Sequence, residues 1–316
     1  MLPTDLTNPI YADADKAREF LESVRWPDGA YCPHCGATGD DVTRMEGKAH
    51  RKGLHQCNGC GQQFSITVGT LYERSHIPLN KWMLATHLLC SSKKGISAHQ
   101  LFRNLGFGSY RTAWFMAHRI REGMDRKSAG PLGGEGKIVE ADTTYIGGKE
   151  KNKHVGKRNE KNIGGAGKMI VHALVERDGR VRSHHIANVT GKTLRPILFG
   201  NVDKKSALMT DTHGGYLHAG KQFARHEVVN HEIDEYVRGD AYTNTVEGYF
   251  SILKRGLNGV YHHVSEAHLH RYLSEFDFRY SERSSLGVDD AQRAYKALKG
   301  ISGKRLTYRR TNEAKA

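Results

Sequence analysis

The sequence has no long apolar run. Its most apolar stretches, such as 82–85 and 88–90, are far shorter than the roughly 20 residues that a membrane-spanning helix needs. The first residues also lack the basic segment followed by an apolar segment that is typical of a secretory signal peptide. We therefore expect a cytoplasmic protein without a membrane partner.

Acidic residues are scarce relative to basic ones. The 34 Asp and Glu residues against 48 Lys and Arg residues give a formal net charge of +14, with a pI near 9.5. This imbalance predicts a polyanionic partner, and it favours nucleic acid over an anionic membrane surface. A chain of 316 residues that is 38% hydrophobic can bury a sizeable core, so we expect two or three folded domains.

Cysteine is rare, but four of the five cysteines form two Cys-x-x-Cys pairs. The pairs are Cys32 with Cys35 and Cys57 with Cys60, separated by residues 36–56, and a glycine follows each pair. Two such knuckles complete a tetrahedral Cys₄ site with no open position, which predicts one structural Zn²⁺ in a zinc ribbon. Disulfides are the alternative, which a reducing compartment disfavours.

Three other residues bear on this site. His34 and His55 lie close to the pairs and could replace a ligand, although four cysteines suffice. Cys90 lies within an apolar run, which indicates an inert buried thiol.

Helical patterns surround the ribbon. Residues 13–25 have helical spacing and end at a Trp-Pro-Asp-Gly stop, and three further helices are predicted from residue 79, over 96–105 and over 109–124. The glycine turn at 106–108 makes the last two a candidate helix-turn-helix, with plain helical packing as the alternative. The longer of these helices carries Arg111, His118, Arg119 and Arg121.

After a glycine-rich linker at 130–136 the pattern changes to strands. Strands are predicted at 138–146, 169–176, 180–189, 206–211 and 227–229, and helices at 192–199, at 214–222 and around Glu247. The order β-β-β-α-β-α-β-α matches a ribonuclease H-like fold. The fold class is thus α/β in a multi-domain α+β chain, with domains at 1–76 (helix and ribbon), 77–130 (helix-turn-helix-like), 131–285 (ribonuclease H-like) and 286–316 (basic tail).

The segment between Gly147 and Lys168 is strongly basic, and we expect it to be mobile until it binds phosphate. Only Glu150 and Glu160 oppose its basic residues, which are Lys149, Lys151, Lys153, Lys157, Arg158, Lys161 and Lys168.

The predicted helix around Glu247 carries two charged residues on one face. Lys254 follows Glu247 by seven residues, which at about 100° per residue brings the two within about 20° of each other. An apolar stripe beside them consists of Val246, Phe250, Leu253 and Leu257. Taken alone, such a pair is typical of a solvated helix surface.

Two aspartates change this interpretation of Glu247. Asp142 lies near the centre of one predicted strand, and Asp211 lies at the carboxyl end of another, with 68 residues between them and a further 35 residues between Asp211 and Glu247. A ribonuclease H-like fold brings these three carboxylates together. Crowded carboxylates need cations, and hard oxygen ligands suit two Mg²⁺ or Mn²⁺ ions for phosphoryl displacement. The alternative is an accidental spacing of abundant acidic residues.

These motifs resemble those of a known family, the bacterial insertion-sequence transposases of the ISXO-like DDE group, over nearly the whole chain. In the N-terminal half the resemblance is carried by Arg25-Trp-Pro-Asp-Gly29, Cys32-Pro-His-Cys-Gly36, residues 57–65 and Gly69-Thr70. In the C-terminal half it is carried by residues 140–148, Thr210-Asp211, residues 243–247, Lys254-Arg-Gly256 and residues 268–280.

The resemblance implies an enzyme that binds double-stranded DNA at terminal inverted repeats, cuts it with metal ions and joins the freed 3′-hydroxyl to target DNA. Asp142 and Asp211 would bridge or flank the metal ions, Glu247 would complete the shell of the second ion, and Lys254 would hold a phosphate near the scissile bond. Synapsis of two ends implies at least a homodimer. Arg255 joins Arg111, Arg119 and the basic segment as candidate DNA contacts.

Some assignments remain open. His213 and Asn244 are either neighbours that orient the metal ligands or ordinary loop residues, and His262, His263, His268 and His270 are interpreted mainly as surface residues. Two other functions compete: a DNA-binding regulator with an inert ribonuclease H-like domain, and a nuclease that only hydrolyses. The complete triad argues against the first, and the ribbon and basic segment argue against the second.

Overall fold

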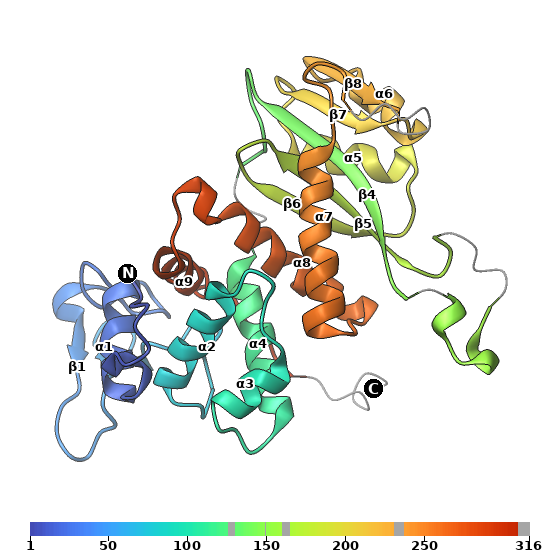
Figure 1. Cartoon of the computed structure of the whole chain (residues 1–316). Helices are drawn as coiled ribbons and strands as arrows, with labels where there is room; N and C mark the ends of the chain where they lie inside the picture. Colours follow the sequence, from blue (N-terminus) through green and yellow to red (C-terminus); the bar gives the residue numbers. More distant parts are fainter. Residues whose placement is uncertain (126–129, 149, 160–164, 231–236, 309–316) are drawn as a thin grey trace. The chain divides into compact units, whose positions relative to one another are not determined.

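The protein is described here by a computed structural model that covers residues 1–125, 130–148, 150–159, 165–230 and 237–308 (Figure 1). The chain divides into two compact units, one of residues 1–125 with residues 287–316, and one of residues 126–286. Among the described residues, no helix combines the length and the apolar character that a membrane crossing requires.

The described residues of the first unit form a small antiparallel sheet and five α-helices. The sheet has the strand order β1-β2-β3, formed by Val42–Arg44, Leu54–Cys57 and Gln63–Ser65. The helices are α1 (Ala14–Arg25), α2 (Leu79–Ser91), α3 (Ala98–Asn104), α4 (Tyr110–Met124) and α9 (Asp290–Lys299). The predicted helix at 13–25 is confirmed: Asp13 caps it by accepting the N–H groups of Asp15 and Lys16.

The short α3 and the longer α4 are joined by the predicted glycine turn. Ser97 caps α3 and Ser109 caps α4, and each side chain accepts a backbone N–H of the first turn. Gly106, between the two helices, has a φ of +59°, a conformation that a side chain disfavours. The local geometry is therefore that of a helix, a turn and a longer helix.

The C-terminal segment corrects the prediction of a basic tail at 286–316. Residues 290–299 form α9, which begins with a capping box between Asp289 and Gln292 and buries Ala294, Ala297 and Leu298. α9 packs against α2, α1 and α4 in the same unit, and Arg293 donates to the Cys90 carbonyl at 2.9 Å. The tail interpretation is therefore wrong over this helix.

The second unit is a five-stranded sheet with the strand order β6-β5-β4-β7-β8. Pairing is antiparallel between β4 (Ile138–Ile146), β5 (Met169–Glu176) and β6 (Val181–Ile186), and parallel between β4, β7 (Ala207–Asp211) and β8 (Arg225–Val229). This mixed sheet, with its three-strand meander followed by two parallel strands, confirms the predicted ribonuclease H-like order. Its helices are α5 (Gly191–Asn201), α6 (Leu217–Gly220), α7 (Asn244–Gly256) and α8 (Glu266–Ser281).

Helices cover both faces of this sheet. On one face, Val171, Ala173 and Val175 of β5 pack against Val246, Phe250 and Leu253 of α7 and against α8. On the other face, Val139, Ala141 and Leu208 pack against Leu194 and Leu198 of α5. Figure 1 shows α7, in orange, crossing in front of β4 and β5. Each face therefore has its own apolar core, and α7 lies on the face opposite α5.

Candidate active site and zinc site

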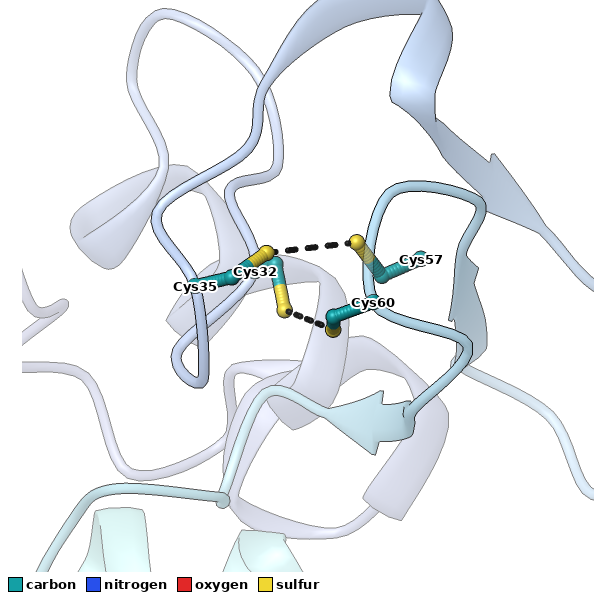
Figure 2. A group of neighbouring side chains, drawn as sticks. All are labelled: Cys32, Cys35, Cys57 and Cys60. Carbon is teal, nitrogen blue, oxygen red and sulfur yellow. Dashed lines mark hydrogen bonds between the residues drawn. The ribbon is translucent and has the colours of Figure 1, made fainter.

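The four paired cysteines form a metal-binding cluster in the first unit (Figure 2). Their Sγ atoms all lie within 4.8 Å of one another, with Cys32 and Cys60 3.7 Å apart and Cys35 and Cys57 3.5 Å apart. A tetrahedral zinc with Zn–S bonds of about 2.3 Å requires S···S separations of about 3.8 Å. The geometry therefore fits the predicted Cys₄ zinc ribbon, and the cysteines are not joined as disulfides.

Each knuckle is closed by its glycine. The Gly36 N–H donates to the Cys32 carbonyl and the Gly61 N–H donates to the Cys57 carbonyl, both at 2.9 Å. Both glycines have positive φ, +82° and +71°, which lets the chain reverse directly after the second thiolate of each pair. The need for this tight turn therefore explains why a glycine follows each Cys-x-x-Cys pair.

The histidines near the ribbon do not join its cluster. His55 is buried and stacks on Phe64 beside Trp26, and the His34 backbone N–H donates to Cys32 Sγ at 3.4 Å. Cys90 is fully buried in α2, as expected of an inert thiol.

Asp142 and Asp211 lie on neighbouring strands of the second unit. The parallel register pairs Ala141 of β4 with Thr210 of β7, so the two aspartates follow at the same level. Side chains alternate along a strand, and Glu140 and Met209 lie on the face that α7 covers. Asp142 and Asp211, each two residues further on, therefore point to that same face.

Glu247 and Lys254 lie on the exposed side of α7, as the helical spacing predicts. Val246, Phe250, Leu253 and Leu257 are buried against the sheet, together with Tyr249. Glu247 is in the first turn of α7, where the Thr243 hydroxyl donates to Glu247 Oε1 at 3.1 Å. The apolar stripe thus fixes the helix while Glu247, Ser251 and Lys254 remain accessible.

The Asp142 carboxyl lies within electrostatic range of the other three candidate residues. Burial raises the pKa of Asp142 to about 7, the N–H of Thr143 opposes this rise, the charges of Asp211 and Glu247 add to it, and Lys254 lowers the pKa. A strand centre, a strand end and a helix thus bring three carboxyl groups and one ammonium to one region. Among the described residues, only the cysteine thiols cluster within 4.8 Å in a group of three or more, so the carboxyl oxygens are more widely spread.

The two loop residues considered as ligand neighbours have different positions. The backbone N–H of His213 donates to Asp211 Oδ1 at 3.1 Å, while its imidazole Nδ1 accepts the Gly215 N–H. His213 thus holds Asp211 through its main chain. Asn244 is the exposed first residue of α7.

Sequence reasoning missed a buried carboxylate beside the site. Glu140 is fully buried and accepts N–H groups from Thr245 and Val246 at 2.8 and 3.0 Å. Arg177 Nε also donates to Glu140, at 2.6 Å. The available signal was the pattern Glu140-x-Asp142, which places a second carboxylate on the same face of the same strand.

The basic segment after β4 has local order in its described part. Glu150 pairs with Lys153 and accepts the Asn159 N–H, and Arg158 donates to the Lys151 and Lys153 carbonyls. Lys151, Lys153 and Arg158 are exposed. Lys149, Lys161 and the side chain of Lys157 lie outside the described residues.

The basic residues of α4 are not equivalent. Arg111 is exposed in the first turn, whereas His118 and Arg121 are each only 1% exposed and so do not lie on a DNA-facing surface. Arg119 is partly buried, lies over the Phe115 ring and donates to the Leu306 and Glu73 carbonyls. His118 and Arg121 are buried because α4 packs against α2, α3 and α9.

The remaining basic candidates lie mainly on the surface. Arg255 is exposed and donates to the Ser251 hydroxyl at 2.8 Å. Of the four histidines near α8, His262, His263 and His270 are exposed and His268 is partly buried, and they form no metal cluster within the described part of the chain.

Comparison with known proteins assigns both sites to one kind of protein. Residues 131–281 match the ISXO2-like transposase domain, and residues 12–63 match the transposase zinc-ribbon domain. The chain is also 29% identical over 279 residues to the "uncharacterized protein in transposable element ISH50" of Halobacterium salinarum, across 84% of this chain and 90% of that protein. The chain therefore contains an ISXO2-like transposase domain, preceded by the transposase zinc ribbon.

Proposed function

We propose that the protein is a metal-dependent DDE transposase that cleaves DNA at the ends of an insertion sequence and joins the 3′-hydroxyl to target DNA. The observation that carries the proposal is the placement of Asp142, Asp211 and Glu247 on β4, β7 and α7, where the latter two act electrostatically on the first. The family supports an enzyme that acts on DNA.

The donor set suits Mg²⁺ or Mn²⁺. All three candidate ligands are carboxylates, the hard oxygen donors that these ions prefer. Two ions about 4 Å apart, when bound, supply activation of the attacking oxygen and stabilisation of the leaving oxygen. Asp142, Asp211 and Glu247 would hold these ions.

The protein's own groups have distinct roles in this proposal. Asp142 is half-buried on β4 and would hold the ions together with Asp211 from β7 and Glu247 from α7. Lys254 is exposed two turns after Glu247, where its ammonium can hold a DNA phosphate beside the scissile bond. The zinc ribbon has no open ligand position and is structural.

DNA recognition falls to the basic surface. Arg111 lies in the first turn of α4. In a helix-turn-helix, residues at this position of the second helix contact base edges. Lys151, Lys153, Arg158 and Arg255 are exposed and can contact phosphates. Two element ends in one synaptic complex require at least a homodimer.

Isosteric substitutions test the proposal. Asp142→Asn, Asp211→Asn and Glu247→Gln should each abolish Mg²⁺-dependent cleavage of the cognate element ends while leaving DNA binding in a gel-shift assay unchanged. Full cleavage by any of the three variants refutes the triad. If the wild-type protein itself does not cleave the element ends, the result favours a DNA-binding regulator.

A further inference from the structure

The N-terminus of α7 is capped by a residue of the sheet. Its own N-cap residue, Thr243, makes no side-chain capping bond. The carboxylate of Glu140 instead accepts the backbone N–H groups of Thr245 and Val246 with Oε2, at 2.8 and 3.0 Å, and the Thr245 hydroxyl with Oε1 at 2.8 Å. An anion at this position satisfies free N–H donors and interacts favourably with the helix dipole.

Arg177 completes the connection from the other side. Its Nε donates to Glu140 Oε1 at 2.6 Å, and its two terminal nitrogens donate to the carbonyls of Asp240 and Tyr242 at 2.8 and 2.9 Å. The guanidinium also lies over the Tyr242 ring, 3.4 Å from its centroid. One buried ion pair thus holds both the start of α7 and the segment that leads into it.

This connection links the two elements that supply catalytic carboxylates. Glu140 and Asp142 lie two residues apart on one face of β4, a separation of about 7 Å. Glu247 follows Thr245 by two residues in the first turn of α7. The path from Asp142 to Glu247 through Glu140 therefore involves one rigid strand segment and less than one turn of helix.

We propose that Glu140, held by Arg177, is a positioning residue that sets where Glu247 stands relative to Asp142, and so sets the divalent-cation affinity of the site. The proposal rests on the proposed function, since it assigns the cation to these carboxylates. The role of Glu140 is distinct from that of a ligand because its carboxylate oxygens accept hydrogen bonds from α7 and Arg177. Partners that orient metal ligands commonly change metal affinity about 10- to 100-fold when they are substituted.

The test compares full-length Glu140→Gln with wild type and with the matched control Glu176→Gln. Glu176 is also a buried, paired carboxylate, bound by Lys137 and the Gly133 N–H, but it has no bond to α7. Mn²⁺ binding is measured by the loss of the free-ion electron paramagnetic resonance signal. We expect Glu140→Gln to bind Mn²⁺ at least about tenfold more weakly, and Glu176→Gln to bind it as wild type does.

Amide hydrogen exchange provides an independent readout. Faster exchange of the Thr245 and Val246 amides in Glu140→Gln, with β5 amides unchanged, supports the positioning role. Unchanged exchange or unchanged Mn²⁺ affinity overturns it. Thr245→Val, which removes only the hydroxyl donor, provides a second variant if Glu140→Gln does not fold, and it should weaken Mn²⁺ binding by a smaller factor.

The two failures are distinguishable. A wild-type protein that binds no Mn²⁺, or binds it without cleaving DNA, refutes the proposed function, whereas the exchange of the Thr245 and Val246 amides still decides whether Glu140 places α7.

Discussion

Replacing Asp142 with Asn should make the protein more stable while it destroys cleavage. In the folded protein without divalent cations, burial raises the pKa of Asp142 from 3.8 to about 7, and the charges of Asp211 and Glu247 contribute. The Thr143 N–H bonds to Asp142 Oδ1 at 2.6 Å, and an Asn side chain can still accept it. The substitution therefore removes the charge and keeps the shape.

The direction of this stability change follows from proton linkage. Between pH 4 and pH 7 the folded state keeps a proton that the unfolded state has released, so the free energy of unfolding falls as the pH rises. A pKa of about 7 in place of 3.8 corresponds to a loss of about 4 kcal/mol, complete above pH 7 and absent below pH 4. Asp142→Asn should recover most of this loss at pH 8.

The assay is denaturant unfolding of the full-length protein. Mg²⁺ is removed by dialysis alone, so that the ribbon keeps its zinc. We expect Asp142→Asn to exceed wild type in stability at pH 8 and to match it near pH 4. Mg²⁺ should then stabilise wild type but not the variant, because a ligand that binds only the folded state stabilises it.

The matched control is Asp178→Asn in the turn between β5 and β6. Asp178 is exposed, and its φ of +53° is one that Asn tolerates. It should unfold as wild type does at both pH values. An Asp142→Asn protein that is less stable than wild type at pH 8 refutes the electrostatic account of the site.

Three other substitutions, two of them paired with a control variant, separate the remaining parts of the structure. Cys57→Ser should lose zinc by metal analysis and destabilise the first unit, whereas Cys90→Ala should keep its zinc; equal zinc contents contradict the ribbon. Arg111→Ala should weaken DNA binding and reduce the slope of its salt dependence by about one, while Arg121→Ala, buried, should lower stability instead. Lys254→Ala should slow cleavage about 100-fold and leave Mn²⁺ affinity unchanged, and an equal cleavage rate contradicts its role.

Local patterns were sufficient for the catalytic unit. The strand at 138–146 and the helix around Glu247 were predicted because each has an unbroken period and clear stop signals. The alternation along β4 also places Asp142 on the face that α7 covers. The residues of the triad remain proposals, but their elements follow from the sequence.

Contacts between distant segments could not be predicted in the same way. His118 and Arg121 look like surface residues on a basic helix, yet they are buried because α4 packs against segments such as α9, more than 160 residues later. Glu140 likewise looks unremarkable until Arg177 and the start of α7 surround it. For α9, by contrast, the sequence carries a local signal, the capping pair Asp289-x-x-Gln292.

The central claim is that the carboxylates perform strand transfer as well as hydrolysis. The most direct measurement incubates the protein with DNA carrying the ends of its element, a supercoiled target and Mg²⁺, and sequences every junction formed. The account predicts element 3′ ends covalently joined to target DNA, with Asp142→Asn forming none. Cleaved ends without any junction to target would contradict it and identify a nuclease that only hydrolyses.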